Sequence, residues 1–417
     1  MPKPELLAVE KAVSLILSEL EVMPAEACHI QDAAGRILAE DIHAKYAHPD
    51  HDVSAMDGYA VCVESSPLPQ GSQLQLIGEA AAGHPFSGQL HPGQAARIFT
   101  GAWLPKGANA ILLQEDALAD GRVIQTREDV TIGQFVRKKG LDFAEGEPLL
   151  AAGTALNARA WALAALAGAE QIQVRRRPRI GILSSGDELV PAGIRPSTGQ
   201  LVNSNSLYLS EVVRHAGAEA VDLGIIEDRR GALGARIADA ATDQGDMPEA
   251  GSLDMILCTG GASVGDHDHI HDELAEMSEG RLNFWRIAMR PGKPLMFGMW
   301  GKTPFLGLPG NPVSAGVCAL IFILPALRRL FGQSQQDELI QATLATPLKQ
   351  NDKRQEYMRA QMKLDADGHR TVTPMPTQDS SMLRIFTDAD ALIIRPPFAP
   401  AAEQGDTVPI LPIPDYF

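Results

Sequence analysis

The sequence predicts a multi-domain protein of the α/β plus β class, built around an α/β domain with a mainly parallel sheet. Strands alternate with helices from residue 178 to about residue 331, the pattern of βαβ units. Residues 51–140 and 340–417 instead carry short alternating runs punctuated by glycine and proline, which indicates small β domains. The length of 417 residues fits two to four domains.

Two helices are expected to flank the first β region. Residues 6–20 place aliphatic side chains three to four positions apart, which predicts an amphipathic helix. A second helix is expected to begin after Asn157, an N-cap residue, and to end at Gly168. Between them, strands are expected at residues 73–77, 110–114 and 122–126.

The α/β region shows its elements clearly. Short buried strands are predicted at residues 179–183, 220–224 and 254–258, with helices over residues 205–215 and 229–243. A capped helix is predicted over residues 311–331, with Asn311 at the N-cap, Pro312 in the first turn and Gly332 past the end.

Composition limits the classes of function. The net charge of −16 argues against a large nucleic-acid footprint, and the short basic run at residues 175–177 reads as a solvated linker. Four cysteines without a C-x-x-C pair indicate neither a disulfide framework nor a structural zinc site. The N-terminus lacks a signal-peptide pattern, and the apolar stretch 313–324 is too short to span a bilayer. We therefore expect a cytoplasmic protein without membrane spans.

Three predicted strands of the α/β domain are followed by loops rich in acids, and two of these loops also carry glycine and hydroxyl residues: 184–188, 225–228 and 259–268. Open parallel sheets bind ligands outside the carboxyl ends of their strands, so these loops should share one rim. Glycine loops admit phosphate oxygens, and clustered carboxylates suit magnesium. One such loop could be a tight turn with a capping acid, but three together favour a site for a phosphate-bearing ligand and a divalent metal.

A second candidate site is cationic. Arg286, Arg290 and Lys293 lie within eight residues around a Pro-Gly turn, which in an acidic protein indicates an anion site or else a solvated basic loop. Residues 308–314 follow as a rigid turn into a helix, and their backbone donors could face the same anion.

Weaker signals stay open at this level. His267, His269 and His271 alternate, which favours an exposed loop or strand over a zinc site. Asp57 at a tight turn and the basic run in residues 137–142 cannot be assigned from spacing alone. The chain has no Walker A motif, no G-x-G-x-x-G fingerprint and no G-x-S-x-G elbow.

Seven motifs together carry a resemblance to a known family. They are SAMDGYA at 54–60, TGA at 100–102, RKKGLD at 137–142, SGDEL at 185–189, TGGASVG at 259–265, PGKP at 291–294 and LPGNPVS at 308–314. In this order they resemble the molybdopterin molybdenumtransferase family, which includes bacterial MoeA and the gephyrin E domain. The resemblance runs from about residue 5 to residue 412.

The resemblance implies an enzyme that inserts molybdenum from molybdate into adenylylated molybdopterin and releases AMP, with Mg²⁺ as the expected ion. It also implies an elongated homodimer whose active cleft lies between the α/β domain of one subunit and the β insertion of the other. Four domains are expected: a helical and extended linking domain (1–50 and 141–176), an inserted β domain (51–140), a three-layer α/β molybdopterin-binding domain (177–332) and a C-terminal β-barrel-like domain (333–417).

Matching positions then imply the site residues. The implied catalytic residues are Asp57, Thr100, Asp142, Glu188, Asp228 and Asp268, with Glu188 and Asp268 as metal ligands. The implied glycine-loop contacts are Ser185, Gly186, Asp187, Gly260, Gly261, Ser263 and Gly265. The implied anion contacts are Arg290, Lys293, Pro294, Pro309, Gly310, Asn311, Ser314, Arg354, Arg359, Ser380 and Ser381.

Several alternatives remain at this level. Positions 286 and 290 are lysine in some relatives, and arginine's planar fork leaves the preference between molybdate and tungstate open. A scaffold of the gephyrin type, a tungsten-specific paralogue, or a pterin- or nucleotide-phosphate enzyme are the other candidates. The last would not need residues 51–140 or 340–417. Beyond small-molecule substrates, possible partners are a molybdopterin adenylyltransferase and molybdoenzyme maturation proteins, with neither nucleic acid nor membrane expected.

Overall fold

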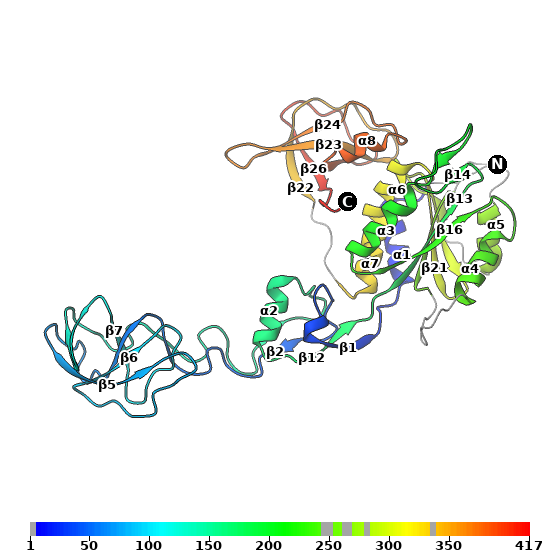
Figure 1. Cartoon of the computed structure of the whole chain (residues 1–417). Helices are drawn as coiled ribbons and strands as arrows, with labels where there is room; N and C mark the ends of the chain where they lie inside the picture. Colours follow the sequence, from blue (N-terminus) through cyan, green and yellow to red (C-terminus); the bar gives the residue numbers. More distant parts are fainter. Residues whose placement is uncertain (1–5, 243–252, 261–268, 279–283, 334–338) are drawn as a thin grey trace. The chain divides into compact units, whose positions relative to one another are not determined.

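The computed structural model describes the chain except for residues 1–5, 243–252, 261–268, 279–283 and 334–338. The chain forms two compact units (Figure 1). We call Ala27–Val174 the N-terminal unit, and Met1–Glu26 together with Arg175–Phe417 the main unit. The four domain boundaries expected from the sequence remain predictions.

The main unit contains the expected α/β sheet. Its six strands run in the order β16 (Glu219–Ile226), β13 (Arg179–Ser185), β17 (Met255–Thr259), β21 (Thr303–Leu308), β20 (Pro294–Trp300) and β18 (Phe284–Arg286). The first four are parallel, β20 pairs antiparallel with β21, and β18 pairs antiparallel with β20, so that β20 alone runs against the other five strands. A mainly parallel sheet is therefore confirmed, and its central strands are almost wholly buried.

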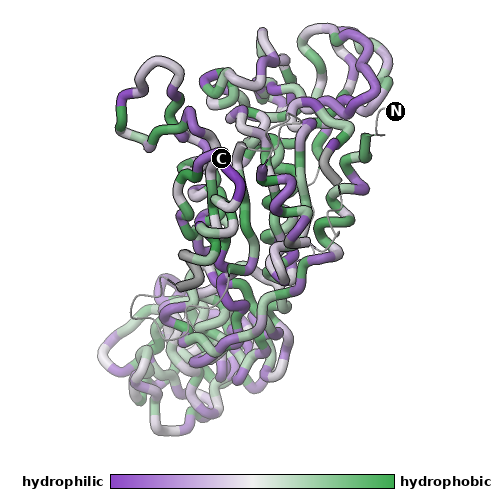
Figure 2. The backbone as a smooth tube through the Cα atoms, turned by 90° about the vertical axis from the view of Figure 1, so that its right-hand side faces the viewer, coloured by the Kyte–Doolittle hydropathy of each residue, from purple (hydrophilic) through white to green (hydrophobic). Residues whose placement is uncertain are grey.

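Helices cover both faces of this sheet, which gives three layers. Figure 1 shows α4 (Ala232–Thr242) and α5 (His269–Met277) on one face, and α1 (Val9–Ser18), α3 (Asn205–His215), α6 (Pro312–Cys318) and α7 (Leu324–Leu330) on the other. Leu233 of α4 and Leu274 of α5 pack in one apolar cluster with the sheet. Figure 2 shows hydrophobic and hydrophilic stretches alternating along the backbone of the chain.

The helix predicted over residues 311–331 is present with an interruption. A π-helical turn, Ala319–Ile323, separates α6 from α7. It comes just before Pro325, which lacks the N–H needed to continue the regular ladder. The span Pro312–Leu330 is long and apolar enough to cross a membrane, so the expectation that this stretch is too short was wrong. Because 78% of that window is buried, it acts as a core helix.

The C-terminal part of the main unit is a small closed barrel. Its strands pair in the order β23 (Gln355–Leu364), β24 (Arg370–Pro374), β22 (Ile340–Leu344), β26 (Thr407–Pro412) and β25 (Ala391–Arg395), and β25 pairs back with β23. The barrel-like domain is thus confirmed. A short strand from the α/β domain, β19 (Met289–Arg290), pairs in parallel with β23 and ties the two domains together.

The N-terminal unit contains the expected β domain and a helical part. Its main sheet runs β7 (Ala110–Leu113), β4 (Gly58–Val61), β6 (Gln94–Ile98), β5 (Gln73–Ala80), β9 (Val123–Thr126) and β8 (Ala117–Asp120). The second predicted helix is α2 (Ala158–Leu166), and the side chain of Asn157 caps it by accepting from two N–H groups at 3.1 Å. Both predictions are confirmed.

Short elements complete the chain. In the N-terminal region they are β1 (Ala25–His29), η1 (Ile30–Asp32), β2 (Ile42–His43), β3 (Val53–Ser54), β10 (Val136–Arg137), β11 (Pro148–Leu150) and β12 (Gln171–Arg175). In the main unit they are β14 (Leu189–Val190), β15 (Leu201–Val202) and α8 (Leu383–Thr387).

Two minor predictions were wrong. The run at 175–177 is not simply solvated, because Arg176 donates two hydrogen bonds to the Asp254 carboxylate. Its Nη2 lies 2.6 Å from Oδ1 and its Nη1 lies 3.0 Å from Oδ2. His269 and His271 begin α5 instead of lying on a loop or strand, and His267 lies outside the described residues. None of the four cysteines forms a disulfide bond, as predicted.

Candidate functional site

A cavity of about 940 Å³ opens in the main unit between the α/β domain and the barrel. Four groups of residues line it: the loop after β13, the segment entering α3, residues 289–294, and residues 309–314 at the start of α6. Thr259 and Gly260 of the loop after β17, and Arg354 and residues 378–381 of the barrel, also line it. The cavity lies at the carboxyl ends of β13, β17 and β21, as expected for an open parallel sheet.

The loops after β13 and β17 meet at this rim. The hydroxyl of Ser184 is buried and lies 3.0 Å from the hydroxyl of Thr259. Gly260 has a φ of +84°, and a Cβ on it would lie 2.1 Å from the carbonyl oxygen of Ser185. Only glycine therefore allows the β17 loop to approach the β13 loop so closely. Both Ser185 and Gly260 line the cavity.

The acids of these loops divide between two hollows. Glu188 lines the main cavity. Asp187 and Asp228 instead line a second hollow of about 440 Å³ together with Gly186. The hydroxyl of Ser185 donates to the Asp228 carboxylate, and the Asp228 N–H donates to Asp187 Oδ1 at 3.0 Å. The loop after β16 thus contacts the loop after β13, and Asp228 lines the second hollow instead of the main cavity.

Four predicted residues of the β17 loop lie outside the described residues: Gly261, Ser263, Gly265 and Asp268. Of the two metal-ligand candidates, Glu188 therefore lies at the main cavity, and Asp268 lies outside the described residues.

The segment carrying Lys293 forms another wall. Arg290, Lys293 and Pro294 line the cavity, as do Pro309, Gly310, Asn311 and Ser314 on the α6 side. Gly292 packs against the core, since a Cβ there would lie 2.8 Å from the buried Cys318 sulfur. Among the described residues, no carboxylate lies within ion-pair distance of the Lys293 ammonium, which is exposed. Arg286, by contrast, does not line the cavity.

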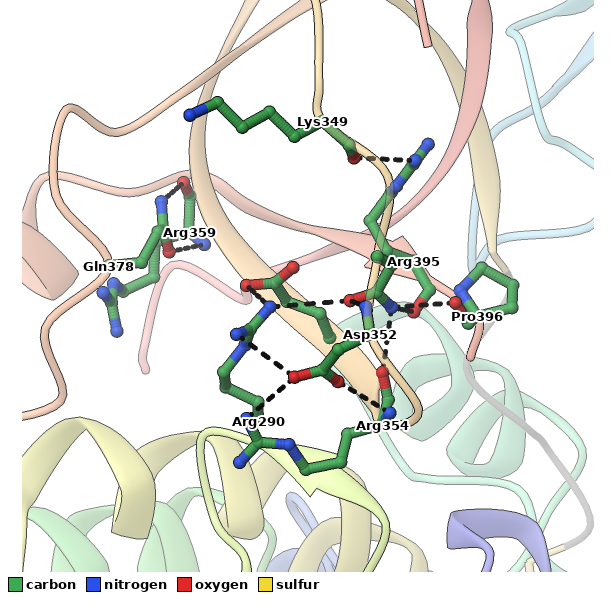
Figure 3. Close-up of polar contacts among 10 residues, drawn as sticks. Arg290, Lys349, Asp352, Arg354, Arg359, Gln378, Arg395 and Pro396 are labelled. Carbon is green, nitrogen blue, oxygen red and sulfur yellow. Dashed lines mark hydrogen bonds and ion pairs between the residues drawn. The ribbon is translucent and has the colours of Figure 1, made fainter. Parts of the chain in front are cut away.

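Both arginines of the cavity are already paired (Figure 3). Arg290 lies 2.8 Å from Glu356 and 3.6 Å from Asp352, and Arg354 lies 3.0 Å from Asp352. The hydrogen bond from the Arg354 side chain is the main stabilising cause that holds the pKa of Asp352 below its ordinary value. The two guanidinium charges are therefore balanced within the chain.

The barrel loop 378–381 joins the start of α6. Asn311 is the N-cap residue of α6, but its amide donates to Ser380 Oγ at 2.9 Å instead of capping the helix. Ser381 donates its N–H and its hydroxyl to Asp379, and these bonds lower the pKa of Asp379. Ser380 and Ser381, which the family resemblance implies as anion contacts, both line the cavity.

Arg359, which the family resemblance implies as an anion contact, is not among the residues that line the cavity. It is fully buried, and its backbone N–H donates to Gln378 while Nη2 donates to the carbonyl of Thr377 at 3.3 Å. Burial lowers the pKa of this guanidinium. Arg359 therefore stabilises the loop 377–381 through hydrogen bonds from a buried position.

Three predicted catalytic residues belong to the N-terminal unit. Asp57 Oδ1 accepts from the N–H and the hydroxyl of Thr100 at 2.8 and 2.9 Å, which lowers the pKa of Asp57. Asp142 is exposed. Thr100 thus holds Asp57 in its charged form at the surface of this unit.

Sequence reasoning missed part of the lining. Asn203, Ser204 and Asn205 line the cavity, and the Asn205 amide donates to the carbonyl of Gly310 at 2.8 Å. Gln378 and Asp379 were missed as well. A signal was available, since residues 203–206 are four consecutive small polar residues at the start of a helix, where exposed N–H groups can meet a ligand.

Comparisons with known proteins cover nearly the whole chain. Family models match residues 7–168 (MoeA N-terminal region, domain I and II), 181–329 (probable molybdopterin binding domain) and 341–413 (MoeA C-terminal region, domain IV). A molybdopterin molybdenumtransferase of Nostoc sp. is 34% identical over 92% of this chain and 87% of its own. One of Haemophilus influenzae is 32% identical over 98% of both chains.

A solved structure gives the same result. The molybdopterin biosynthesis MoeA protein of Pyrococcus horikosii is 28% identical, with a TM-score of 0.79 over 98% of this chain and 99% of its own.

Proposed function

Because this chain belongs to the MoeA family of molybdopterin molybdenumtransferases, we propose that its 940 Å³ cavity is the place where molybdenum enters the pterin. The chain is a transferase of molybdenum cofactor biosynthesis. The finer proposal is that molybdate is the metal source, that adenylylated molybdopterin is the acceptor, and that AMP is released.

One observation carries this proposal. A single cavity brings together the glycine-containing strand-end loops and the lysine-bearing segment 290–294. Ser185, Thr259 and Gly260 bring polar backbone groups to the rim where phosphate oxygens would lie. Lys293, which pairs with no carboxylate among the described residues, offers a cation, and Ser314 a hydroxyl, to a separate oxyanion. Holding two anionic reactants side by side replaces a bimolecular encounter by a step within one complex.

The charges of the cavity fit a divalent cation. Three cations line it: Arg290, Lys293 and Arg354. Two carboxylates, Glu188 and Asp379, also line it, and two more, Asp352 and Glu356, pair with the arginines. The described residues thus offer no net positive charge to two anionic ligands. We propose that Mg²⁺ binds through Glu188 and Asp268, since carboxylate oxygens are its preferred protein ligands. When bound, the ion would neutralise phosphate charge and polarise the phosphoryl group.

The chain's own side chains then have distinct roles in the proposal. Lys293 and the N–H groups of Arg290 bind and orient molybdate. Asn205 donates to the carbonyl of Gly310, and this hydrogen bond holds the start of α3 next to the loop that precedes α6. Loop 377–381, supported by the buried Arg359, closes the site from the barrel side.

We also propose a cytoplasmic homodimer, from the family resemblance. In it, Asp57, Thr100 and Asp142 of one subunit would contribute to the site of the other. The adenylylated substrate must come from an adenylyl-transfer reaction, which makes a molybdopterin adenylyltransferase the natural supplier.

The test is AMP release from adenylylated molybdopterin with magnesium, with and without molybdate. We expect release to depend on molybdate, and Glu188→Gln to lose at least about tenfold in rate while the fold persists. Glu403→Gln, an exposed carboxylate of the barrel, is the control with the same change in charge. Near-normal turnover in Glu188→Gln would reject its role, and binding of the ligand without AMP release would indicate a carrier or scaffold. Tungstate in place of molybdate tests the metal preference.

A further inference from the structure

The arginines of the cavity face fixed carboxylates from the barrel. Figure 3 shows Arg290 and Arg354 approaching Asp352 from two sides. The distances are 3.6 Å from Arg290 to Asp352, 3.0 Å from Arg354 to Asp352, and 2.8 Å from Arg290 to Glu356. An incoming oxyanion must therefore share these guanidinium N–H groups with two carboxylates that are already present.

The backbone holds Asp352 in place. The neighbouring Asn351 is only 6% exposed, and its amide donates to the carbonyls of Arg354, Arg395 and Pro396 at 2.8 to 2.9 Å. Asp352 Oδ1 also accepts from the Arg354 N–H at 2.8 Å. The carboxylate thus sits on a rigid turn, unlike the mobile partners of an ordinary surface ion pair.

Glu356 is fixed by strand pairing. It lies on β23 directly opposite Arg290 on β19, and its side chain is 15% exposed. Because the register of the two strands sets this pair, Glu356 meets Arg290 whenever the barrel is docked on the α/β domain.

Lys293 differs from both arginines. Within the described part of the chain, its ammonium has no carboxylate partner, although it lines the same cavity. A bound oxyanion would thus draw its net attraction from Lys293, while the two guanidinium groups would supply directed N–H donors whose charge is already balanced.

We propose that Asp352 and Glu356 are specificity-determining residues of this cavity. They act as resident counter-ions that lower its affinity for free inorganic oxyanions, so that abundant ions such as sulfate do not fill it. The proposal rests on the proposed function in one respect only, namely that an oxyanion binds beside Arg290. If these ion pairs only joined the barrel to the α/β domain, removing a carboxylate would weaken anion binding. If the carboxylates act as counter-ions, removing one strengthens anion binding.

The test is calorimetric titration of the full chain with sodium sulfate and, separately, sodium molybdate at low ionic strength. We expect Asp352→Asn and Glu356→Gln each to bind both anions roughly three- to tenfold more tightly than the parent, with the gain shrinking as salt is added. Asparagine and glutamine each keep a carbonyl oxygen for the N–H groups that the carboxylates now accept. Asp365→Asn is the control, since Asp365 is an exposed barrel aspartate that also accepts backbone N–H groups, but its ion-pair contact is with His369 and not with an arginine that lines the cavity.

Unchanged or weaker anion binding in a variant that unfolds at the parent's temperature would overturn the proposal. Equal tightening in Asp365→Asn would do the same, because it would reveal only a bulk-charge effect. If Asp352→Asn fails to fold, Glu356→Gln decides. The titration contains no pterin, so a parent protein without molybdate-dependent AMP release would count against the proposed function alone.

Discussion

Replacing Gly260 with alanine should distort the cavity at its most crowded backbone contact. Gly260 has a φ of +84°, and a new Cβ would lie 2.1 Å from the carbonyl oxygen of Ser185. Gly199 has the same φ of +84° with no atom within 4 Å of a new Cβ, and it does not line the cavity. The pair therefore separates the effect of backbone conformation from the effect of crowding.

The magnitudes follow from this geometry. Gly199→Ala should cost about 1 kcal/mol, because alanine tolerates a positive φ poorly. Gly260→Ala bears the same conformational cost and a clash with main-chain atoms of β13, which can move only with the sheet. Overpacking of this kind adds about 1–3 kcal/mol.

Urea unfolding followed by intrinsic fluorescence measures both variants, and anion titration reports on the cavity. We expect Gly260→Ala to have the lower midpoint and weakened anion binding, and Gly199→Ala to bind as the parent does. A midpoint for Gly260→Ala no lower than that of Gly199→Ala would refute the close-approach argument.

Three further changes test other parts of the structure. Asp254→Ala should lower the free energy of unfolding in urea by about 2–4 kcal/mol, because it removes the bidentate partner of Arg176 and the acceptor of the Arg179 N–H. The control Glu219→Ala, at an exposed carboxylate, should change it by less than about 0.5 kcal/mol, and equal effects of the two variants would contradict this. Glu273→Ala should cost about 1–3 kcal/mol and speed hydrogen exchange at the start of α4, whose N–H groups it accepts, and unaltered exchange there would argue against it. Asp352 has a pKa below its ordinary 3.8, so its ionised form stabilises the fold above that pH and the contribution disappears as pH falls through the lowered pKa; Asp352→Asn should flatten the acid limb of the stability curve, and an identical limb would contradict the assignment.

Local signals predicted much of the fold. The helix over residues 205–215 was predicted with the bounds of α3, since an apolar stripe and the following Gly217 define it without help from the rest of the chain. Asn157 was predicted as a cap and does cap α2. The π-helical turn before Pro325 was not predicted, because it depends on how the long helix packs in the core.

The site was predictable where topology alone decides it. The rule that ligands bind beyond parallel strands placed Ser185, Glu188 and Gly260 at one cavity. It could not show that Asp228 lines the second hollow, because this depends on how its loop contacts Ser185 and Asp187 of the β13 loop.

Contacts between the domains were beyond sequence reasoning. The pairing of Arg290 with Glu356 depends on β19 meeting β23, which lies some 65 residues further along the chain. Asn311 carries a clear N-cap signal, yet its amide bonds Ser380 of the barrel instead. In each case a local pattern identifies the residue type, and only the tertiary contact identifies its partner.

The most direct test of the central claim is to locate molybdate in a crystal. Anomalous diffraction at the molybdenum absorption edge, from crystals soaked in sodium molybdate, should give a peak inside the main cavity beside Lys293 and Arg290, and Lys293→Met should lose it. A peak at another surface, or an undiminished peak in Lys293→Met, would contradict the assignment of this cavity as the site of molybdenum insertion.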